Sequence, residues 1–469
     1  MKPFSMHRFN ESVSLTIING SMTMLQTTMK RTLWGMLGVT MVAMANCETT
    51  VVAQVALRGA RILTMAGEPI DSGVILIRDG RIEAVGADLR IPVEFKVLDV
   101  SGKIVMPGFV DVHTSGGMGQ ANERNPNVPF LSALDTIDAK STFFEECRRN
   151  GITTAGISPG NSTMIGGQIA VLKTDGLFVP DMTLQRLVGV KISLRPPGGS
   201  RMSHLSALRR ELNRAKKFKA DGQVTAGEEG DTARDAEARG DAERTGDQQG
   251  GEAAEEGAQP ATAAQQQEGI KILSQLIGGE LLAVIYCDNA MDVGQALKLI
   301  EEFELRPMLV LGTQVDQAVE LLKGKTYPVV LDTNLVFWRS QPRTRVEEKV
   351  SLPKLFNDAG VAYMFQAETN PSRATLGSNY LWYQAATAVK YGLSREQALA
   401  ALTIEPARAL GIDQWVGSIE PGKDADLVVL SGDPLSTTTW VEQTLIGGRV
   451  VYERSQDEKL RRLLEQPDQ

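Results

Sequence analysis

The chain has 469 residues, of which 42% are hydrophobic and 23% charged, and its net charge is −8. This composition is typical of a globular protein rather than a disordered one, and the length predicts a large core or two domains. Because no cluster of Lys or Arg offsets the negative charge, the sequence argues against a nucleic-acid-binding protein. Three cysteines, Cys47, Cys147 and Cys287, are too few for a disulfide framework or a thiolate metal site.

Residues 1–48 are predicted to be a targeting segment. Within residues 29–45, two basic residues precede a short apolar run that ends in a small-x-small cleavage pattern. The run is too short to span a bilayer stably. We therefore expect export to the periplasm or the medium, with no membrane span after processing. Translation from Met29 and lipidation of Cys47 both stay open.

Two β-rich regions flank the middle of the chain. Strand-like runs at 74–77 and 82–85 are separated by an Asp-Gly pair, which is a strong signal for a two-residue hairpin. Similar β-rich sequence returns after residue 427. Residues 49–107 and 412–456 are therefore predicted to form one composite β-sandwich domain.

The middle of the chain, residues 108–411, alternates strand-like and helix-like segments. Helical segments have apolar residues at every third or fourth position, and Ser394 begins a capping box. Such alternation implies a parallel sheet, and about 250 ordered residues is the usual length of an eight-stranded barrel. The predicted fold class is α/β, a (β/α)8 TIM-type barrel. The strand candidates are residues 104–112, 153–158, 187–192, 282–287, 308–311, 329–331 and 362–366.

Residues 219–269 interrupt this pattern because they contain no Leu, Met or aromatic residue. Such a stretch cannot bury enough apolar surface to offset its ordering entropy. It is predicted to be a disordered acidic insertion between two barrel elements. A partner-binding segment is the alternative.

One strand end has the pattern of a metal site with a ligand replaced. An apolar strand ending in Asp-x-His-x-His would aim two imidazoles to the same side, which is the start of a zinc site. In residues 107–115 the second imidazole position is occupied by Ser115. The chain has three histidines, His7, His113 and His204, whereas a histidine-based catalytic centre needs about three protein ligands.

Three further motifs occur in a distinctive order, at residues 102–111, 401–407 and 417–429. With them the chain resembles the amidohydrolase superfamily, in particular its imidazolonepropionase-like and cyclic-amide hydrolase branch, over nearly all of residues 55–455. The resemblance implies a (β/α)8 barrel with a β-sandwich made from both ends. It also implies hydrolysis of C–N bonds by a metal-bound water, with a last-strand carboxylate accepting the proton.

Transferred position by position, the family's metal site is incomplete in this chain. His113 corresponds to the first imidazole. The other ligand and base positions carry different residues, namely Ser115, Tyr286 or Asp288, Leu311, and Thr369-Asn370-Pro371 with Glu368 one residue earlier. Glu368 and Asp288 are the candidate catalytic carboxylates. We predict that no cofactor is bound, or at most one divalent ion (Zn, Mn or Fe).

His113 and Lys191 each have a second interpretation. His113 could hold an ion together with Asp111, Asp288 and Glu368, an oxygen-rich set that suits Mg, Ca or Mn. The favoured alternative is a hydrogen-bonded histidine at the barrel mouth. Lys191 is the sole candidate for a carboxylated bridging lysine, but a solvated or salt-bridged lysine is the ordinary expectation.

A glycine-rich loop at residues 158–168 follows a strand, on the face where barrel active sites lie. Its backbone N–H groups could hold an anion, or its glycines could serve a tight turn that needs positive φ. The pocket is predicted to include Ser115, Tyr286, Asn161, Gly166, Gly167 and Thr369. Cys147 and Cys287 are expected to be buried thiols, and His204 a surface histidine.

Two functions follow from these residues. The first is an exported, metal-poor pseudoenzyme of the superfamily that has lost hydrolysis and keeps a pocket for a small molecule or a partner protein. The alternative is an active metal-dependent hydrolase of cyclic-amide-like, non-peptide C–N bonds with a rebuilt site. Under the first, we expect substoichiometric metal, no hydrolysis of hydantoin-like or acyl-peptide substrates, and no effect of His113→Ala on either. The ligand is not specified, and a homo-oligomer stays open.

Overall fold

The computed structural model describes residues 54–197, 199–221, 261–341, 343, 345–368 and 377–465. The predicted targeting segment, the central part of the predicted insertion and Thr369 lie outside these residues. No helix in the described ranges is both long and apolar enough to cross a membrane.

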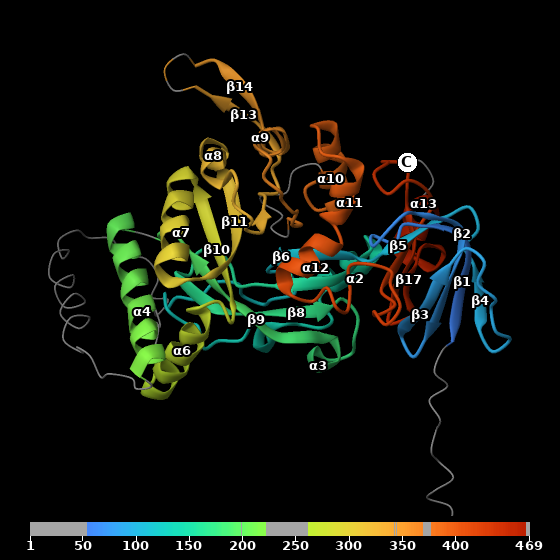
Figure 1. The fold of residues 1–469 in the computed structure, drawn as a ribbon, viewed down its shortest axis with the longest axis horizontal. Helices are drawn as coiled ribbons and strands as arrows, with labels where there is room; N and C mark the ends of the chain where they lie inside the picture. The colour runs from blue at the N-terminus through green and yellow to red at the C-terminus, as the bar shows by residue number, and fades with distance from the viewer. Residues whose placement is uncertain are drawn as a thin grey trace, which may run out of the picture. The chain divides into compact units, whose positions relative to one another are not determined.

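The first sheet contains eight strands that come from both ends of the chain (Figure 1). Its order is β17-β16-β15-β5-β1-β2-β3, with β4 beside β1. The strands are β1 (Val55–Ile62), β2 (Ile70–Arg78), β3 (Arg81–Gly86), β4 (Lys96–Asp99), β5 (Ile104–Pro107), β15 (Leu427–Leu430), β16 (Val441–Ile446) and β17 (Arg449–Glu453). The antiparallel β5–β15 pair joins the two ends. The predicted domain bounds, residues 49–107 and 412–456, stay a prediction.

The β2–β3 hairpin forms where the Asp-Gly pair predicted it. Asp79 and Gly80 have φ of 56° and 77°, which matches the primed turns that suit the twist of two-residue hairpins. Leu57, Ile75 and Leu427, all 1% exposed or less, fill one face of the sheet.

The second sheet has seven strands in the order β12-β11-β10-β9-β8-β7-β6. They are β6 (Phe109–Thr114), β7 (Ile152–Ile157), β8 (Ile165–Lys173), β9 (Thr183–Ser193), β10 (Leu282–Asn289), β11 (Arg306–Gln314) and β12 (Val329–Val330). A bridge between Val330 and Met364 adds an eighth position in parallel to β12. From that segment, Gln366 reaches His113 of β6 through a 2.8 Å hydrogen bond between their side chains. The sheet is thus nearly closed into a barrel.

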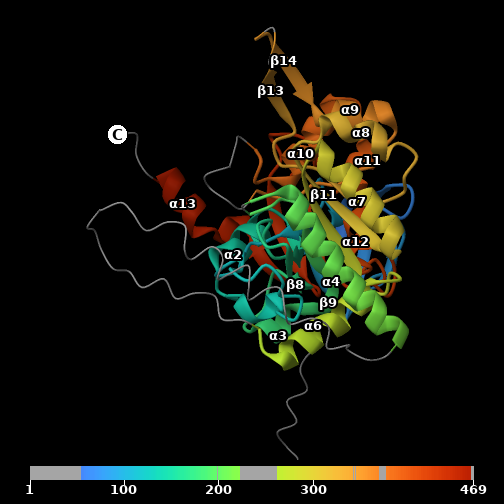
Figure 2. The same ribbon diagram turned by 90° about the vertical axis from the view of Figure 1, so that its left-hand side faces the viewer.

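Most helices cover the outside of this second sheet. They are α2 (Thr142–Arg149), α3 (Val179–Met182), α4 (Arg201–Asp221), α6 (Ala263–Leu276), α7 (Ala290–Phe303), α8 (Val319–Leu322), α9 (Leu352–Ala359), α10 (Leu381–Lys390), α11 (Arg395–Ala400) and α12 (Ile404–Leu410). The short 3₁₀ turns η1 (Ala133–Thr136) and η2 (Asp316–Ala318) lie between them. In Figures 1 and 2, α4 and α6 lie side by side, and their residues are in contact.

Sequence signals account for the ends of several helices. Asn289 caps α7 in a reciprocal capping box with Asp292, and the apolar side of that helix faces β10. Ser394 caps α11 in the same way, as predicted. Beyond the barrel, η3 (Arg454–Gln456) and α13 (Glu458–Glu465) follow β17 near the end of the described chain.

The predicted regular (β/α)8 alternation is present only in part. β8 is antiparallel to both β7 and β9, although the other paired strands of this sheet are parallel. The connection of seven residues between β7 and β8 contains no helix. An antiparallel neighbour can be reached through a short loop, whereas a parallel one needs a long crossover. Residues 165–173, which we expected to begin as a loop, therefore form a strand.

The predicted bounds of the disordered insertion, 219–269, are wrong at both ends. α4 continues to Asp221, and α6 begins at Ala263 behind a capping box of Thr262 and Gln265. The ends of the insertion lack large apolar residues but continue helices whose other turns are anchored in the core, as Leu212 and Leu273 are. Residues 222–260 lie outside the described ranges.

A two-stranded hairpin, β13 (Val336–Ser340) and β14 (Glu347–Ser351), projects from the body of the molecule in both views (Figures 1 and 2). Trp338 on it is 65% exposed. The sequence analysis assigned no structure to this segment.

Candidate functional site

Three barrel strand positions bring their polar side chains together at His113. The Nε2 atom of His113 lies 2.6 Å from Nζ of Lys191 on β9, and its Nδ1 lies 2.8 Å from Oε1 of Gln366. Lys191 is completely buried and His113 is 7% exposed. We call these three residues the His113 cluster.

The hydrogen bonds of Gln366 fix the tautomer of His113. The Nε2 atom of Gln366 donates to the carbonyl oxygen of Leu331 at 2.9 Å, so its Oε1 is the atom that faces the ring. A ring Nδ1–H must then donate to Gln366, which leaves the Nε2 lone pair to accept from Lys191. The lone pair that a metal ion would use is therefore already occupied.

Burial makes the charged forms of the cluster unfavourable. Burial lowers the pKa of Lys191 to about 7, and burial followed by the nearby Lys191 charge lowers the pKa of His113 well below its usual range. Burial also raises the pKa of the Cys287 thiol on β10 to about 12. Above pH 7 the cluster is thus an uncharged hydrogen-bonded chain.

Asp111 is a buried carboxylic acid two residues before His113 on β6. It is 0% exposed, and neither of its carboxyl oxygens makes a hydrogen bond of normal geometry with a described residue. Burial raises its pKa to about 8, against a smaller opposing effect of the backbone N–H groups of Ala367 and His113. A carboxyl group in such surroundings is protonated at neutral pH.

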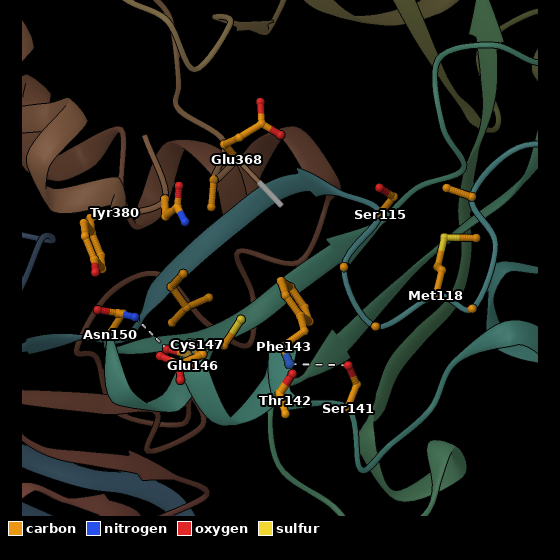
Figure 3. A pocket seen from close by; sticks show the side chains of 17 residues that line it. Ser115, Met118, Ser141, Thr142, Phe143, Glu146, Cys147, Asn150, Glu368 and Tyr380 are labelled. Carbon is orange, nitrogen blue, oxygen red and sulfur yellow. Dashed lines mark hydrogen bonds between the residues drawn. The ribbon is translucent and has the colours of Figure 1, made fainter. Parts of the chain in front are cut away.

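A cavity of about 640 Å³ has Ala367, the neighbour of Gln366 in the chain, in its wall (Figure 3 shows the cavity). It lies between the loop after β6, one side of α2, and the segment that follows Gln366. Ser115 and Glu368, both predicted site residues, line it together with Tyr380. Among its described lining residues, the charged ones are Glu146 and Glu368, so the cavity has a negative lining.

The other predicted site residues lie elsewhere around the barrel mouth. The hydroxyl of Tyr286 donates to Asp288 Oδ1 at 2.8 Å, and Nζ of Lys191 lies 5.6 Å from the centre of the Tyr286 ring. Tyr286 therefore borders the His113 cluster. Glu368 accepts a hydrogen bond from the Thr333 hydroxyl at 3.1 Å. Thr369 lies outside the described residues.

The glycine-rich loop serves close packing rather than a turn with positive φ. Gly166 and Gly167 are not among the glycines with positive φ. A Cβ on Gly166 would lie 3.2 Å from Cβ of Lys191, and one on Gly167 would lie 2.5 Å from the carbonyl oxygen of Leu131. Asn161 accepts from the Ser193 hydroxyl through its backbone carbonyl, while its own side-chain oxygen is buried without a described partner. Anion binding by this loop stays a prediction.

The donor set does not fit a divalent metal ion of the family's kind. Among the described residues, no group of three or more His, Cys, Asp or Glu side chains is placed to hold an ion. In the His113 cluster there is one imidazole, and the amine of Lys191 occupies the Nε2 atom of that ring.

Two residues of the site were underrated from sequence, and one was missed. Lys191 and Asp111 were expected to be a solvated lysine and a strand-end residue, yet both are fully buried. Gln366 was not singled out. A polar residue between apolar residues of a strand could have indicated a buried polar group. Lys191, for example, lies between Val190 and Ile192. His204 is also buried rather than at the surface, because its Nε2 bonds the carbonyl oxygen of Ser193 at 2.8 Å.

Comparison with known proteins identifies the family. The model of the amidohydrolase family matches residues 104–451. An imidazolonepropionase of Porphyromonas gingivalis is 40% identical over 104 residues, which cover 21% of this chain and 24% of that protein. An amidohydrolase of Hapsidospora irregularis is 23% identical over 428 residues, which cover 81% of this chain and 40% of that protein. The crystal structure of an amidohydrolase from Thermotoga maritima MSB8 matches with a TM-score of 0.67 at 24% identity, and covers 85% of this chain and 100% of that one.

The three likenesses carry different weight. The two sequence relatives are matched over less than half of their own length, so they do not transfer an activity. The Thermotoga structure shows a shared fold of a barrel with a smaller domain. The family match extends from β5 to β17, across the barrel and into the composite sheet. The chain therefore belongs to the amidohydrolase family.

Proposed function

We propose that this protein is a metal-poor amidohydrolase homologue that binds a small molecule in the cavity between β6 and α2 and does not hydrolyse it. The observation that carries this proposal is the 2.6 Å contact between Lys191 Nζ and His113 Nε2. The resemblance to the family implies a metal ion bound to the imidazole at this position. In this chain the same nitrogen accepts a hydrogen bond from a buried amine, and a metal could bind only after that bond is broken.

The lining of the cavity restricts the ligand. Its volume of about 640 Å³ suits a small organic molecule. Glu146 is compensated by Arg149 and Lys459, whereas Glu368 accepts a hydrogen bond from the neutral hydroxyl of Thr333. A neutral or cationic ligand that donates hydrogen bonds to Glu368 is favoured over an anion.

Metal content gives the direct test of the first part. Protein purified in the presence of zinc and manganese is expected to carry well below one ion per chain by inductively coupled plasma mass spectrometry, because a site with one imidazole holds a divalent ion weakly. Hydantoin and imidazolone-type amides are expected to show no turnover above the uncatalysed rate. About one tightly held ion per chain together with turnover would contradict the proposal.

Binding of a cationic probe tests the second part. Benzylammonium is expected to raise the melting temperature of the wild type and benzoate is not, since the cavity presents carboxylates. Glu368→Gln should weaken the benzylammonium response about tenfold, which is the usual worth of a charge-assisted hydrogen bond. Glu405→Gln removes an exposed carboxylate on α12 that is already paired with Arg408, and serves as the matched control. An equal response of Glu368→Gln and the wild type would rule out this cavity.

An active hydrolase with a rebuilt site is the second candidate, and Asp111 is the observation that favours it. Its carboxyl group is buried and makes no hydrogen bond of normal geometry with a described residue, which is unusual for a group that merely orders a strand. Such a group could act on a bound amide as a proton donor. This candidate predicts turnover that is lost in Asp111→Asn, a result that the first candidate does not allow. Export, likewise, stays a proposal based on residues 29–45.

A further inference from the structure

A second cavity, of about 450 Å³, lies on the side of the composite sheet, away from the His113 cluster. Its walls come from α2, the start of α10, the loop before β16, β17 and α13, elements that gather on one side of Figure 1. The lining is rich in aromatic residues, which are Phe109, Tyr380, Trp382, Trp440 and Tyr452. We call it the C-terminal cavity.

Some of the charged residues that line the C-terminal cavity form ion pairs within the described part of the protein, and one does not. Arg149 forms an ion pair with Asp457 at 2.9 Å, and Asp457, whose side chain is 4% exposed, also accepts from the Tyr452 hydroxyl at 3.1 Å. Lys459 lies 3.0 Å from Glu145. These three charges are therefore compensated within the protein.

Arg454 is different. Its guanidinium lies 4.7 Å from the centre of the Trp440 ring, and no described carboxylate is within ion-pair distance of it. A cation–π contact does not use the N–H groups of a guanidinium, which keep the fork that binds a carboxylate through two hydrogen bonds. The cavity thus offers a strong anion donor at the edge of an aromatic wall.

The wall of the C-terminal cavity includes large apolar side chains that are exposed to solvent. Trp440 is 54% exposed, Leu463 of α13 is 69% exposed, and α13 has no buried residue. Apolar surface grouped around a concavity marks a binding site more often than apolar residues scattered singly.

We propose that the C-terminal cavity binds a small planar aromatic anion, with its ring against Trp440 and its carboxylate on Arg454. The volume accommodates a ligand of one or two fused rings. An anionic ligand is favoured because Arg454 is a cation without an ion pair among the described residues, whereas the charged residues that line the first cavity are carboxylates. The two cavities share Asn150 and Tyr380 in their walls, but this proposal does not depend on the function proposed for the first.

Isothermal titration of the full chain with 2-naphthoate tests the proposal, beside the neutral 2-naphthalenemethanol and the cationic 2-naphthylmethylammonium. Naphthoate is expected to bind with a Kd below about 1 mM, a usual affinity for a ligand of this size. The alcohol and the ammonium should bind at least about tenfold more weakly, because they lose the charge-assisted hydrogen bonds.

Substitutions locate the site. Arg454→Gln and Trp440→Ala should each weaken naphthoate binding about tenfold. Arg58→Gln, which alters an exposed arginine of β1, and Trp338→Ala, which alters an exposed tryptophan on the β13–β14 hairpin, should leave it unchanged within twofold. All four side chains are partly or largely exposed, so the variants are expected to keep the wild-type melting temperature. Absence of saturable binding, binding that neither Arg454→Gln nor Trp440→Ala alters, or equal binding of the alcohol would each overturn the proposal.

Discussion

Asp111→Asn is expected to stabilise the protein at pH 8 by roughly 2 kcal/mol, although it alters a completely buried polar residue. The folded-state pKa of Asp111 is raised to about 8, from an ordinary value of 3.8. Between these values the native protein keeps a proton that the unfolded chain releases, so the free energy of unfolding falls as pH rises, by up to about 1.4 kcal/mol per pH unit. Asn has no charge to bury and removes this loss. The unpaired amide left behind costs about 1–3 kcal/mol, which is why the net gain is smaller than the shift alone implies.

The dependence of the free energy of unfolding on pH distinguishes the loss of the Asp111 charge from a change in packing. The variant should be the less stable protein near pH 4, where only the cost of the unpaired amide acts, and the urea midpoints should cross between about pH 4.5 and 6 and separate progressively toward pH 8. Asp426→Asn is the matched control, because Asp426 is 5% exposed but bonds the Lys173 ammonium. Breaking that pair should destabilise the protein by about 3–5 kcal/mol at pH 8. If Asp111→Asn also destabilises at pH 8, the carboxylate has a partner that stabilises its charge.

Local signals predicted individual elements better than their arrangement. The strand expected at 153–158 is β7, and the one at 282–287 begins β10 at the predicted residue. Hydrophobic periodicity reports burial and spacing but not direction, so the antiparallel course of β8 could not be predicted. The run 104–112 was expected as one strand and is two, β5 and β6, with Gly108 between them. A Cβ on Gly108 would lie 2.2 Å from the hydroxyl oxygen of Thr153, so the position has room only for glycine.

The candidate site was predictable in location but not in its bonding. The strand-end motif drew attention to His113, whose role in a site stays a prediction, and Ser115 and Glu368 line one cavity. What His113 contacts depends on which residues of β9 and of the segment after β12 arrive beside it, 78 and 253 positions later in the chain. Only the closed sheet brings Lys191 and Gln366 to its two nitrogens. His113 thus lies in a sequence pattern that resembles a metal site, but in the folded protein its two nitrogens are hydrogen bonded to Lys191 and Gln366.

Lys191→Met should also stabilise the protein at pH 7, with the opposite dependence on pH. The pKa of the buried amine is lowered to about 7, from 10.5. Between pH 7 and 10.5 the unfolded chain holds a proton that the native protein lacks, so the free energy of unfolding rises with pH by up to about 1.4 kcal/mol per unit. Methionine has a similar shape and no proton to lose, so that slope should disappear. His113 Nε2 loses its donor at a cost of about 1–3 kcal/mol, which leaves a net gain of roughly 2 kcal/mol at pH 7 and a net loss near pH 10.

The comparison with Lys173 makes this result decisive. Lys173 is also a largely buried lysine, but it binds Asp424 and Asp426, and these carboxylates raise its pKa although burial opposes them. Lys173→Met should therefore destabilise the protein by about 3–5 kcal/mol across the neutral range, because two carboxylates lose their counter-ion. Urea unfolding of both variants from pH 6 to 10 measures the contrast. If Lys191→Met behaves like Lys173→Met, then Lys191 is protonated in the native protein with an anion beside it, and the uncharged hydrogen-bonded chain that excludes a metal from His113 would be disproved.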